Sequence, residues 1–358
     1  GFWTPDPSVQ PDLSERRAWQ VQRESNWRDV FDAIYQQSQP DDSRPGQPNF
    51  VGWISSLNGK PYTQDEMIEW VQHCVEFCRQ AAKLDAVLEI GCGTGLLLFP
   101  LAKAASRYVA TDVSERVIDD LRTQIANLDD LQHVQIKQGS ALEATTAFAE
   151  DLFDTVILNS VVQYFPDTQY LEEVIEGLMD RVARGGKILI GDQQNFDLFD
   201  LYCLDLAKHS CGPGADLHEL GIVASQMRTE QEELWLSPRY FSDLVNRFDR
   251  IVDVQIAPRR GGNSTEMDRY RFNVVLHLDQ SDLASPDSSE WQSFESGMDC
   301  QELAAKLHTA GGKSFGIRGV PNPRLSSLIE LANRIQLSGS TGRTSMPSVA
   351  DEMDEGVE

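Results

Sequence analysis

Three glycines that alternate with other residues are the most informative chemical feature of the sequence. Gly91, Gly93 and Gly95 lie in the segment VLEIGCGTGLLL at residues 87–98, between an apolar run that predicts a buried strand and a helical pattern. Glycines at such a turn allow positive φ angles and let a ligand approach the backbone closely. Asp112 follows at the end of the next predicted strand, where a carboxylate can bind both hydroxyls of a ribose. The spacing therefore predicts a site for a cofactor that contains a nucleoside.

Two classes of cofactor compete for this turn. Enzymes that bind nicotinamide dinucleotides usually have a GxGxxG sequence, in which the third glycine lets a helix pack closely below the pyrophosphate. Here the corresponding position, counted from Gly91, holds Leu96. Glu89 at the end of the strand would repel a pyrophosphate, but it could order the turn and the region of a methionine ammonium group. We therefore expect S-adenosylmethionine, and a nucleotide-linked redox function is the alternative.

The segments around the turn alternate between strand and helix patterns. Such alternation is typical of a parallel sheet with helices on both faces, so we expect an α/β, Rossmann-like fold. Later strand patterns at residues 251–256 and 269–278 predict an antiparallel pair at the end of the sheet. The expected strands of the parallel part lie at 86–90, 108–112, 134–138, 155–159 and 187–192, and the expected helices lie at 95–104, 115–126 and 168–182.

Two helices are predicted before the glycine turn. Apolar residues recur at helical spacing over residues 19–37, and Thr63 with Glu66 forms a capping box for a helix that runs to about residue 82. The stretch between the helices, residues 49–62, combines aromatic and small polar residues without a clear period. Such a stretch is either a packed loop or a lid over a site.

We expect four parts along the chain. The helical and lid segment comes first, then the α/β core, then a smaller α/β extension. The last segment is rich in serine, glycine and acidic residues, which is typical of a linker. The expected boundaries are 1–82 for the N-terminal segment, 83–280 for the core, 281–338 for the extension and 339–358 for the linker.

The overall charge limits the choice of partners. The chain has 31 basic and 56 acidic residues among 358, which gives a formal charge of −25 at pH 7. A surface this acidic repels phosphate backbones and anionic lipids, so neither nucleic acid nor a membrane is an expected partner. No apolar run approaches the length of a membrane span and no secretory signal opens the chain, so we expect a cytoplasmic protein. The six cysteines lack zinc-ligand spacing, so we expect reduced thiols and no metal.

Several motifs resemble those of class I methyltransferases that depend on S-adenosylmethionine. EIGCGTG at residues 89–95 and TD at 111–112 resemble the first two motifs of that class, which implies its Rossmann-like core. Further stretches resemble the methyltransferase domains embedded in nonribosomal peptide and polyketide synthases. These stretches are NFVGWISSLNGKPYTQDEM at 49–67, NSVVQYF at 159–165, EEL at 232–234, RYRFNVVLHL at 269–278 and IRGVPNPRL at 317–325.

The resemblance implies a substrate held as a thioester on an acyl or peptidyl carrier protein, with neighbouring synthase domains as further partners. Residues 1–5, GFWTP, are similar to the segment in which polyketide synthase acyltransferase domains end. This similarity favours O-methylation of a β-hydroxyl or enol in a polyketide. N-methylation of an aminoacyl thioester is the alternative, and C-methylation or a catalytically silent scaffold domain are the remaining ones.

Roles for individual residues follow from the fold and the resemblance. Glu89, the three glycines and Asp112 are expected to bind the cofactor. Ser140 and Ala141 follow the third strand, where the adenine edge meets backbone N–H groups in this fold, and Asn159 ends the fourth strand beside the methionine part.

The acceptor side of the site has four expected residues and two candidate bases. Gln163 and Tyr164 should lie beside the transferred methyl, and Trp53 with Ser55 should cover the cofactor as part of a lid. The bases considered are Glu266, in the loop before the last strand, and His209, at the end of the helix after the fifth strand. Related domains commonly carry His-Asn-Glu where this chain has Ser264, Thr265 and Glu266, so a mechanism that needs the histidine is in doubt.

Overall fold

The computed structural model describes most of the chain. The described residues are 13–36, 45–148, 151–262, 265–280, 291–295, 298–309 and 316–339. The predictions for residues 1–5, for Ser264 and for the linker after residue 339 lie outside them. Contacts between backbone positions divide the chain into two compact units, which we describe separately. The first unit comprises residues 1–215 and 220–281, and the second comprises residues 216–219 and 282–358.

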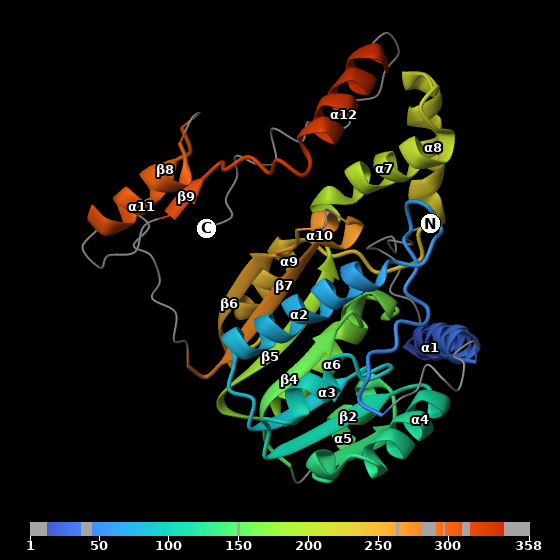
Figure 1. Ribbon diagram of the computed structural model, residues 1–358, viewed down its shortest axis with the longest axis vertical. Helices are drawn as coiled ribbons and strands as arrows, with labels where there is room; N and C mark the ends of the chain where they lie inside the picture. The colour runs from blue at the N-terminus through green and yellow to red at the C-terminus, as the bar shows by residue number, and fades with distance from the viewer. Residues whose placement is uncertain are drawn as a thin grey trace. The chain divides into compact units, whose positions relative to one another are not determined.

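A seven-stranded sheet forms the centre of the first unit (Figure 1), with the order β3-β2-β1-β4-β5-β7-β6. All neighbouring strands are parallel except around β7, which runs antiparallel to β5 and to β6. The predicted fold class, with its antiparallel pair at the end, is confirmed. The strands are β1 (Ala86–Ile90), β2 (Arg107–Asp112), β3 (Val134–Gln138), β4 (Phe153–Asn159), β5 (Val182–Gln194), β6 (Ile251–Pro258) and β7 (Arg271–Leu278).

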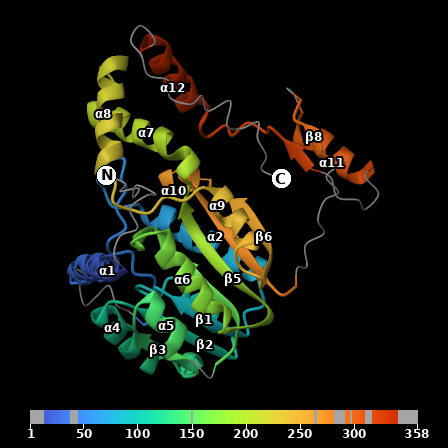
Figure 2. The same ribbon diagram turned by 180° about the vertical axis from the view of Figure 1, so that it is seen from behind.

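Helices cover both faces of this sheet (Figures 1 and 2). One face packs on α2, α3 and α4, and the other packs on α5, α6 and α9. The helices of this unit are α1 (Leu13–Tyr35), α2 (Gln64–Ala81), α3 (Leu98–Ala102), α4 (Glu115–Ala126), α5 (Ala141–Ala147), α6 (Thr168–Met179), α7 (Phe199–Cys211), α8 (Leu217–Glu230, whose first residues fall in the second unit), α9 (Pro238–Ser242) and α10 (Glu266–Tyr270). Short 3-10 turns are η2 (Asp129–Leu131), η3 (Val162–Tyr164), η4 (Phe196–Leu198) and η5 (Asp243–Asn246).

The central strands are apolar almost throughout because both of their faces are buried. Along β5, Ile188 packs with the α5 and α6 side of the core, and Leu189 packs with the α2 side. Burial on two faces explains why these strands lack the alternation seen in strands with one wet face. The predicted capping box at the start of α2 is confirmed, since the Thr63 N–H donates to Glu66 Oε2 at 2.8 Å.

Three local predictions are wrong. The helix expected over residues 95–104 begins only at Leu98, because Gly95 has a φ of +84° and cannot continue a helix. Residues 266–268 are not a loop but open α10, which a capping box between Thr265 and Asp268 begins. The helix α8 was not predicted from the sequence at all. Of its residues only Leu220 is buried, so no apolar stripe marks it.

The second unit is small. Its strands β8 (Trp291–Ser293) and β9 (Gly316–Arg318) form a parallel pair in which Trp291 lies opposite Gly316. A side chain at Gly316 would collide with the Trp291 ring, so glycine is required there for this packing. Its helices are α11 (Cys300–Thr309) and α12 (Ser326–Gly339). Across the described parts of both units, no helix is long and apolar enough to cross a membrane.

Candidate cofactor and acceptor site

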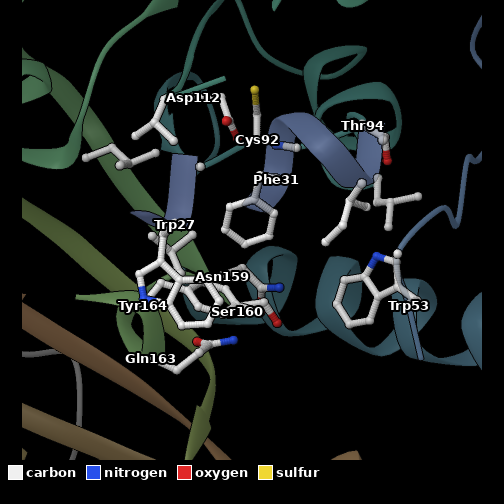
Figure 3. A pocket seen from close by; sticks show the side chains of 18 of the residues that line it. Trp27, Phe31, Trp53, Cys92, Thr94, Asp112, Asn159, Ser160, Gln163 and Tyr164 are labelled. Carbon is white, nitrogen blue, oxygen red and sulfur yellow. Dashed lines mark hydrogen bonds between the residues drawn. The ribbon is translucent and has the colours of Figure 1, made fainter. Parts of the chain in front are cut away.

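A cavity of about 270 Å³ lies at the carboxyl ends of β1, β2 and β4. This edge is where ligands bind in open α/β sheets. Figure 3 shows Asp112 and Cys92 on one side of the Phe31 ring, and Asn159, Ser160 and Tyr164 on the other side. The cavity therefore has a part next to the glycine turn, which we call the cofactor end. A second part, next to Gln163, Glu233 and Arg271, we call the acceptor end.

The glycine turn forms one wall of the cofactor end. Gly91 and Gly93 line the cavity and have φ angles of +74° and +50°. A Cβ at Gly91 would lie 2.4 Å from a methyl group of Val161, so no other residue fits there. Gly95 is not among the lining residues. Its role is packing, because a Cβ there would lie 2.8 Å from the Phe99 ring.

Asp112 is held in the cavity wall by the backbone. Its Oδ2 accepts the Gly93 N–H at 2.9 Å, and its Oδ1 accepts the Ser114 N–H at 3.0 Å. Burial raises the pKa of this carboxyl, and the two N–H donors oppose the rise. A carboxylate has about four acceptor positions, so each oxygen can still accept from a ligand hydroxyl. The arrangement fits the two hydroxyls of a ribose.

Glu89 also lines the cofactor end. Its side chain is buried, and the Tyr108 hydroxyl donates to its Oε2 at 2.7 Å. Burial raises the pKa of Glu89 to about 8, against the lowering effect of Tyr108, and nearby Asp112 adds to the rise. A cation placed here would favour the charged carboxylate. Two acidic groups in one small space therefore fit a ligand that carries positive charge.

Asn159 presents a buried amide to the cavity. Among the described residues, neither amide atom is in hydrogen-bonding geometry with a protein group, although the side chain lies beside the Cys74 thiol. Buried polar atoms without a partner are rare, and a ligand is one explanation for them. The next residue, Ser160, has a φ of +55°, and its hydroxyl donates to the Asp192 carboxylate. Strained residues of this kind cluster at functional sites.

The segment after β3 contributes to the same end. Gly139 and Ala141 line the cavity, whereas Ser140 between them is not among the lining residues. Ser140 instead caps α5, with its hydroxyl accepting the Glu143 N–H at 3.2 Å. The predicted position of the segment is thus observed, but Ser140 has a structural task there.

Aromatic residues of α1 line the cavity, although no role was predicted for them. Trp27 and Phe31 both pack on Tyr164, with ring centroids 4.7 and 5.0 Å apart. A hydrogen bond attaches α1 to the segment after β2, since the Ser114 hydroxyl donates to Asp32 at 2.5 Å. The helical spacing of these aromatic residues was visible, but spacing alone does not distinguish a core helix from a lid.

The predicted lid loop contributes Trp53, which lines the cavity and packs on Trp70 at 4.4 Å between ring centroids. Ser55, also predicted, is buried but is not among the lining residues, whereas Ser56 is. Gln163 and Tyr164 both line the cavity, as expected from their position after β4.

Neither predicted base lines the cavity. The Glu266 carboxylate accepts the Ser56 N–H at 2.8 Å. Burial alone would raise the pKa of Glu266, but hydrogen bonds from Tyr62 and Ser55 outweigh it, and the pKa is lowered. His209 lies in the last turn of α7, with Nδ1 2.8 Å from the Asp205 carbonyl oxygen. Glu266 therefore orders the lid loop, and the base role of either residue stays a prediction.

Charged residues that the sequence analysis did not single out form the acceptor end. Glu233, Arg271 and Tyr62 line it. The Arg271 guanidinium is in contact with the buried Asp192 carboxylate, which also binds Arg259 at 2.9 Å. The stretches EEL and RYR that contain Glu233 and Arg271 were noticed only as motifs. Neither has a periodicity or spacing that assigns a role.

Comparison with known proteins identifies the kind of domain. Residues 88–188 match the family described as "Methyltransferase domain". The chain contains a methyltransferase domain. The family predicted from the sequence is confirmed, and the match supports S-adenosylmethionine as the methyl donor. The residues at the cofactor end fit that donor, with acceptors for a ribose and acidic groups for its positive charges.

The methyltransferase chain is similar to segments of far longer proteins. It is 33% identical to chondramide synthase cmdD of Chondromyces crocatus over 337 residues, which is 90% of this chain and 8% of that protein. It is 27% identical to peramine synthetase ppzA of Metarhizium rileyi, over 96% of this chain and 12% of that protein. It is 28% identical to the beauvericin nonribosomal cyclodepsipeptide synthetase of Beauveria bassiana, over 88% of this chain and 10% of that protein. The chain thus spans about a tenth of the length of these relatives.

Solved structures also align with part of the methyltransferase chain. The N-methyltransferase NodS of Bradyrhizobium japonicum aligns with a TM-score of 0.39 and 17% identity, over 61% of this chain and 98% of that one. The magnesium protoporphyrin IX methyltransferase of Synechocystis aligns with a TM-score of 0.46 and 16% identity, over 72% of this chain and 100% of that one.

Proposed function

We propose that this chain is the methyltransferase domain of a modular peptide synthetase and methylates the amino nitrogen of an aminoacyl thioester on a carrier protein. The observation that carries the proposal is the single cavity that joins a cofactor end, at Asp112, to an acidic acceptor end, at Glu233. The names of the matched relatives, which are peptide synthetases or related synthases, support an aminoacyl substrate.

This proposal departs from the oxygen preference of the sequence analysis. That preference depended on residues 1–5, which lie outside the described residues. A carboxylate at the acceptor end suits an ammonium group better than a neutral hydroxyl, because opposite charges attract strongly in a site that excludes water. O-methylation of a hydroxyacyl or enol intermediate remains the alternative, and the experiment below separates the two.

The residues at the cofactor end would bind the cofactor and orient its methyl group. Asp112 would accept from the ribose hydroxyls, and the backbone of Gly139 and Ala141 would contact the adenine. Glu89 and Asn159 would hold the methionine part. When bound, the cofactor supplies an electrophilic methyl group on a positively charged sulfur. Placing the acceptor atom near that methyl, in line with the bond that breaks, provides most of the rate enhancement.

Aromatic residues exclude water between the two ends. Trp27 and Phe31 pack on Tyr164, and Trp53 lines the cavity apart from this group (Figure 3). A dry site strengthens the electrostatic interactions that orient the reactants. The thioester arm of a carrier protein would have to reach Gln163 and Glu233 between these residues.

The test compares matched substrates on one carrier protein. Wild-type protein is incubated with S-adenosylmethionine and carrier proteins that hold either an aminoacyl or the corresponding hydroxyacyl thioester, and the products are weighed by mass spectrometry. The proposal predicts one added methyl group on the aminoacyl substrate and little on the hydroxyacyl one. Methylation of the hydroxyacyl substrate alone would establish the alternative.

A further inference from the structure

Backbone hydrogen bonds of the residues that follow Glu233 hold its segment at the acceptor end. The Leu234 N–H donates to the Gln163 carbonyl at 2.7 Å, and the Leu236 N–H donates to the Gln194 carbonyl at 3.2 Å. The Gln194 side chain donates to Glu233 Oε2. The carboxylate is thus held between the end of β5 and the segment that carries Gln163, which lines the cavity. Such support is typical of a residue with a positioned functional group rather than a mobile surface acid.

Glu233 has no close cation of its own. Among the ion pairs of the described residues, none joins Glu233 to a basic group within 4 Å. The nearby Arg271 is already in contact with Asp192. Burial raises the pKa of Glu233, and Arg271 and Gln194 oppose the rise. The carboxylate therefore lies in a site that favours its partnership with a further cation.

The ionisable groups that face Glu233 come from several elements. Their charges decide how it titrates, and each is a possible partner or competitor. They are Arg271 of β7, Asp192 of β5, Tyr164 of η3 and Tyr202 of α7. The phenols stay neutral at physiological pH, since burial raises the pKa of both, that of Tyr202 to about 12. Asp192 is paired with both Arg271 and Arg259, whereas no ion pair of the described residues includes Glu233.

We propose that Glu233 is the catalytic residue that binds the substrate ammonium group and accepts its proton, so that the nitrogen attacks as a free amine. This inference rests on the function proposed above. One proton moves from nitrogen to the Glu233 carboxylate. The nitrogen lone pair then forms the bond to the methyl carbon as the carbon–sulfur bond breaks, and its electron pair stays on sulfur as a neutral thioether.

A proton acceptor is needed because the substrate arrives mostly charged. The pKa of an α-amino group is about 7.7–8.0, so at pH 7 most of it is ammonium and has no lone pair. Positive charge on the donor sulfur also disfavours a second cation beside it. The other acids that line the cavity are Glu24, Glu89 and Asp112. Glu24 accepts from the Tyr170 hydroxyl at 3.3 Å, Glu89 accepts from Tyr108, and Asp112 accepts two backbone N–H groups at the cofactor end.

The first test is the pH dependence of turnover. Glu233→Gln keeps the shape but removes the basicity, so at pH 7 kcat/KM on an aminoacyl carrier protein should fall roughly a hundredfold or more. The ratio of wild type to variant should shrink towards pH 9, where the amine is already neutral. In Glu233→Ala, added formate should restore part of the activity. The matched control is Glu232→Gln, because its exposed side chain is not among the cavity-lining residues.

A second readout does not depend on turnover. In the presence of S-adenosylhomocysteine, calorimetry with an aminoacyl pantetheine amide should show weaker binding to Glu233→Gln than to wild type, while binding of the hydroxyacyl analogue and of S-adenosylhomocysteine stays unchanged. Unchanged S-adenosylhomocysteine binding also shows that the variant is folded. If wild type methylates the aminoacyl substrate and Glu233→Gln does so with the same rate and pH profile, the role of Glu233 is overturned. The proposed function would stand in that case. A wild type inactive on that substrate would overturn the proposed function and the inference together.

Discussion

The two ends of the cavity are built in different ways. At the cofactor end, Asp112 is held by backbone N–H groups of the glycine turn and of the residue that caps the next helix. At the acceptor end, Glu233, Arg271 and Tyr62 come from segments far apart in the chain. There, side chains contact the charged groups, because Gln194 donates to Glu233 and Asp192 pairs with Arg271. A strand-to-helix turn is a local structure, so its sequence is contiguous and recognisable. The acceptor end exists only after the chain has folded.

This difference predicts that damage to one end leaves the other intact. The largest expected effect is that of Asp112→Ala, which removes a charged acceptor of two ribose hydroxyl bonds. Those bonds contribute on the order of 2–4 kcal/mol, so S-adenosylhomocysteine binding should weaken by roughly 30- to 1000-fold. Calorimetry measures this, with Asp130→Ala as an exposed control. Unchanged affinity in Asp112→Ala would remove this residue from the site.

The pKa of Glu89 provides a test that concerns the cofactor end alone. Burial holds the pKa of Glu89 at about 8, and a bound cation would lower that pKa. Binding therefore releases a proton, so cofactor affinity should rise by up to about tenfold per pH unit below pH 8 and level off above it. Glu89→Gln should flatten this profile. Wild type and Glu89→Gln both contain Asp112, so a difference between their pH profiles of cofactor affinity is due to Glu89. Identical profiles would contradict the placement of Glu89 beside the cofactor.

A smaller effect is expected at Asn159. Among the described residues the Asn159 amide lies beside the Cys74 thiol but meets no protein group in hydrogen-bonding geometry, so removing it should change the thermal stability of the protein without cofactor little. Losing its bond to the methionine part should weaken cofactor binding by about tenfold. Thermal unfolding with and without S-adenosylhomocysteine compares Asn159→Ala with Asn246→Ala, an exposed control. A large stability loss without ligand would show that the amide has a structural partner.

The smallest effects on catalysis are expected at the bases first considered from the sequence. Glu266→Gln should change kcat/KM by less than about tenfold, because this carboxylate binds the lid loop rather than the substrate. Folding lowers the pKa of Glu266, so its carboxylate stabilises the fold at pH values above the pKa that Glu266 has in the unfolded chain. This stabilisation is lost as the pH falls through the pKa of Glu266 in the folded protein. The stability difference from wild type should therefore shrink as the pH falls below about 4. A hundredfold loss of turnover would restore Glu266 as the base.

The sequence was sufficient for the sheet and for the cofactor end. β1, β3 and α4 begin and end where predicted, because buried parallel strands and capped helices have strong local patterns. The acceptor end was missed because Glu233 lies in a segment without periodicity. The surroundings of Glu266 were not predicted, because the expected loop is the short helix α10 and the Glu266 carboxylate accepts the Ser56 N–H. Partners that far apart in the sequence cannot be paired from one sequence.

The central claim is that one cavity holds the cofactor at Asp112 and the acceptor nitrogen at Glu233. The most direct test is a crystal structure of the wild-type protein with S-adenosylhomocysteine and an unreactive aminoacyl pantetheine amide. The account predicts the ribose hydroxyls on Asp112 and the amino nitrogen within hydrogen-bonding distance of the Glu233 carboxylate. A complex in which the nitrogen instead contacts Glu266 or His209, with Glu233 turned away from the substrate, would contradict it.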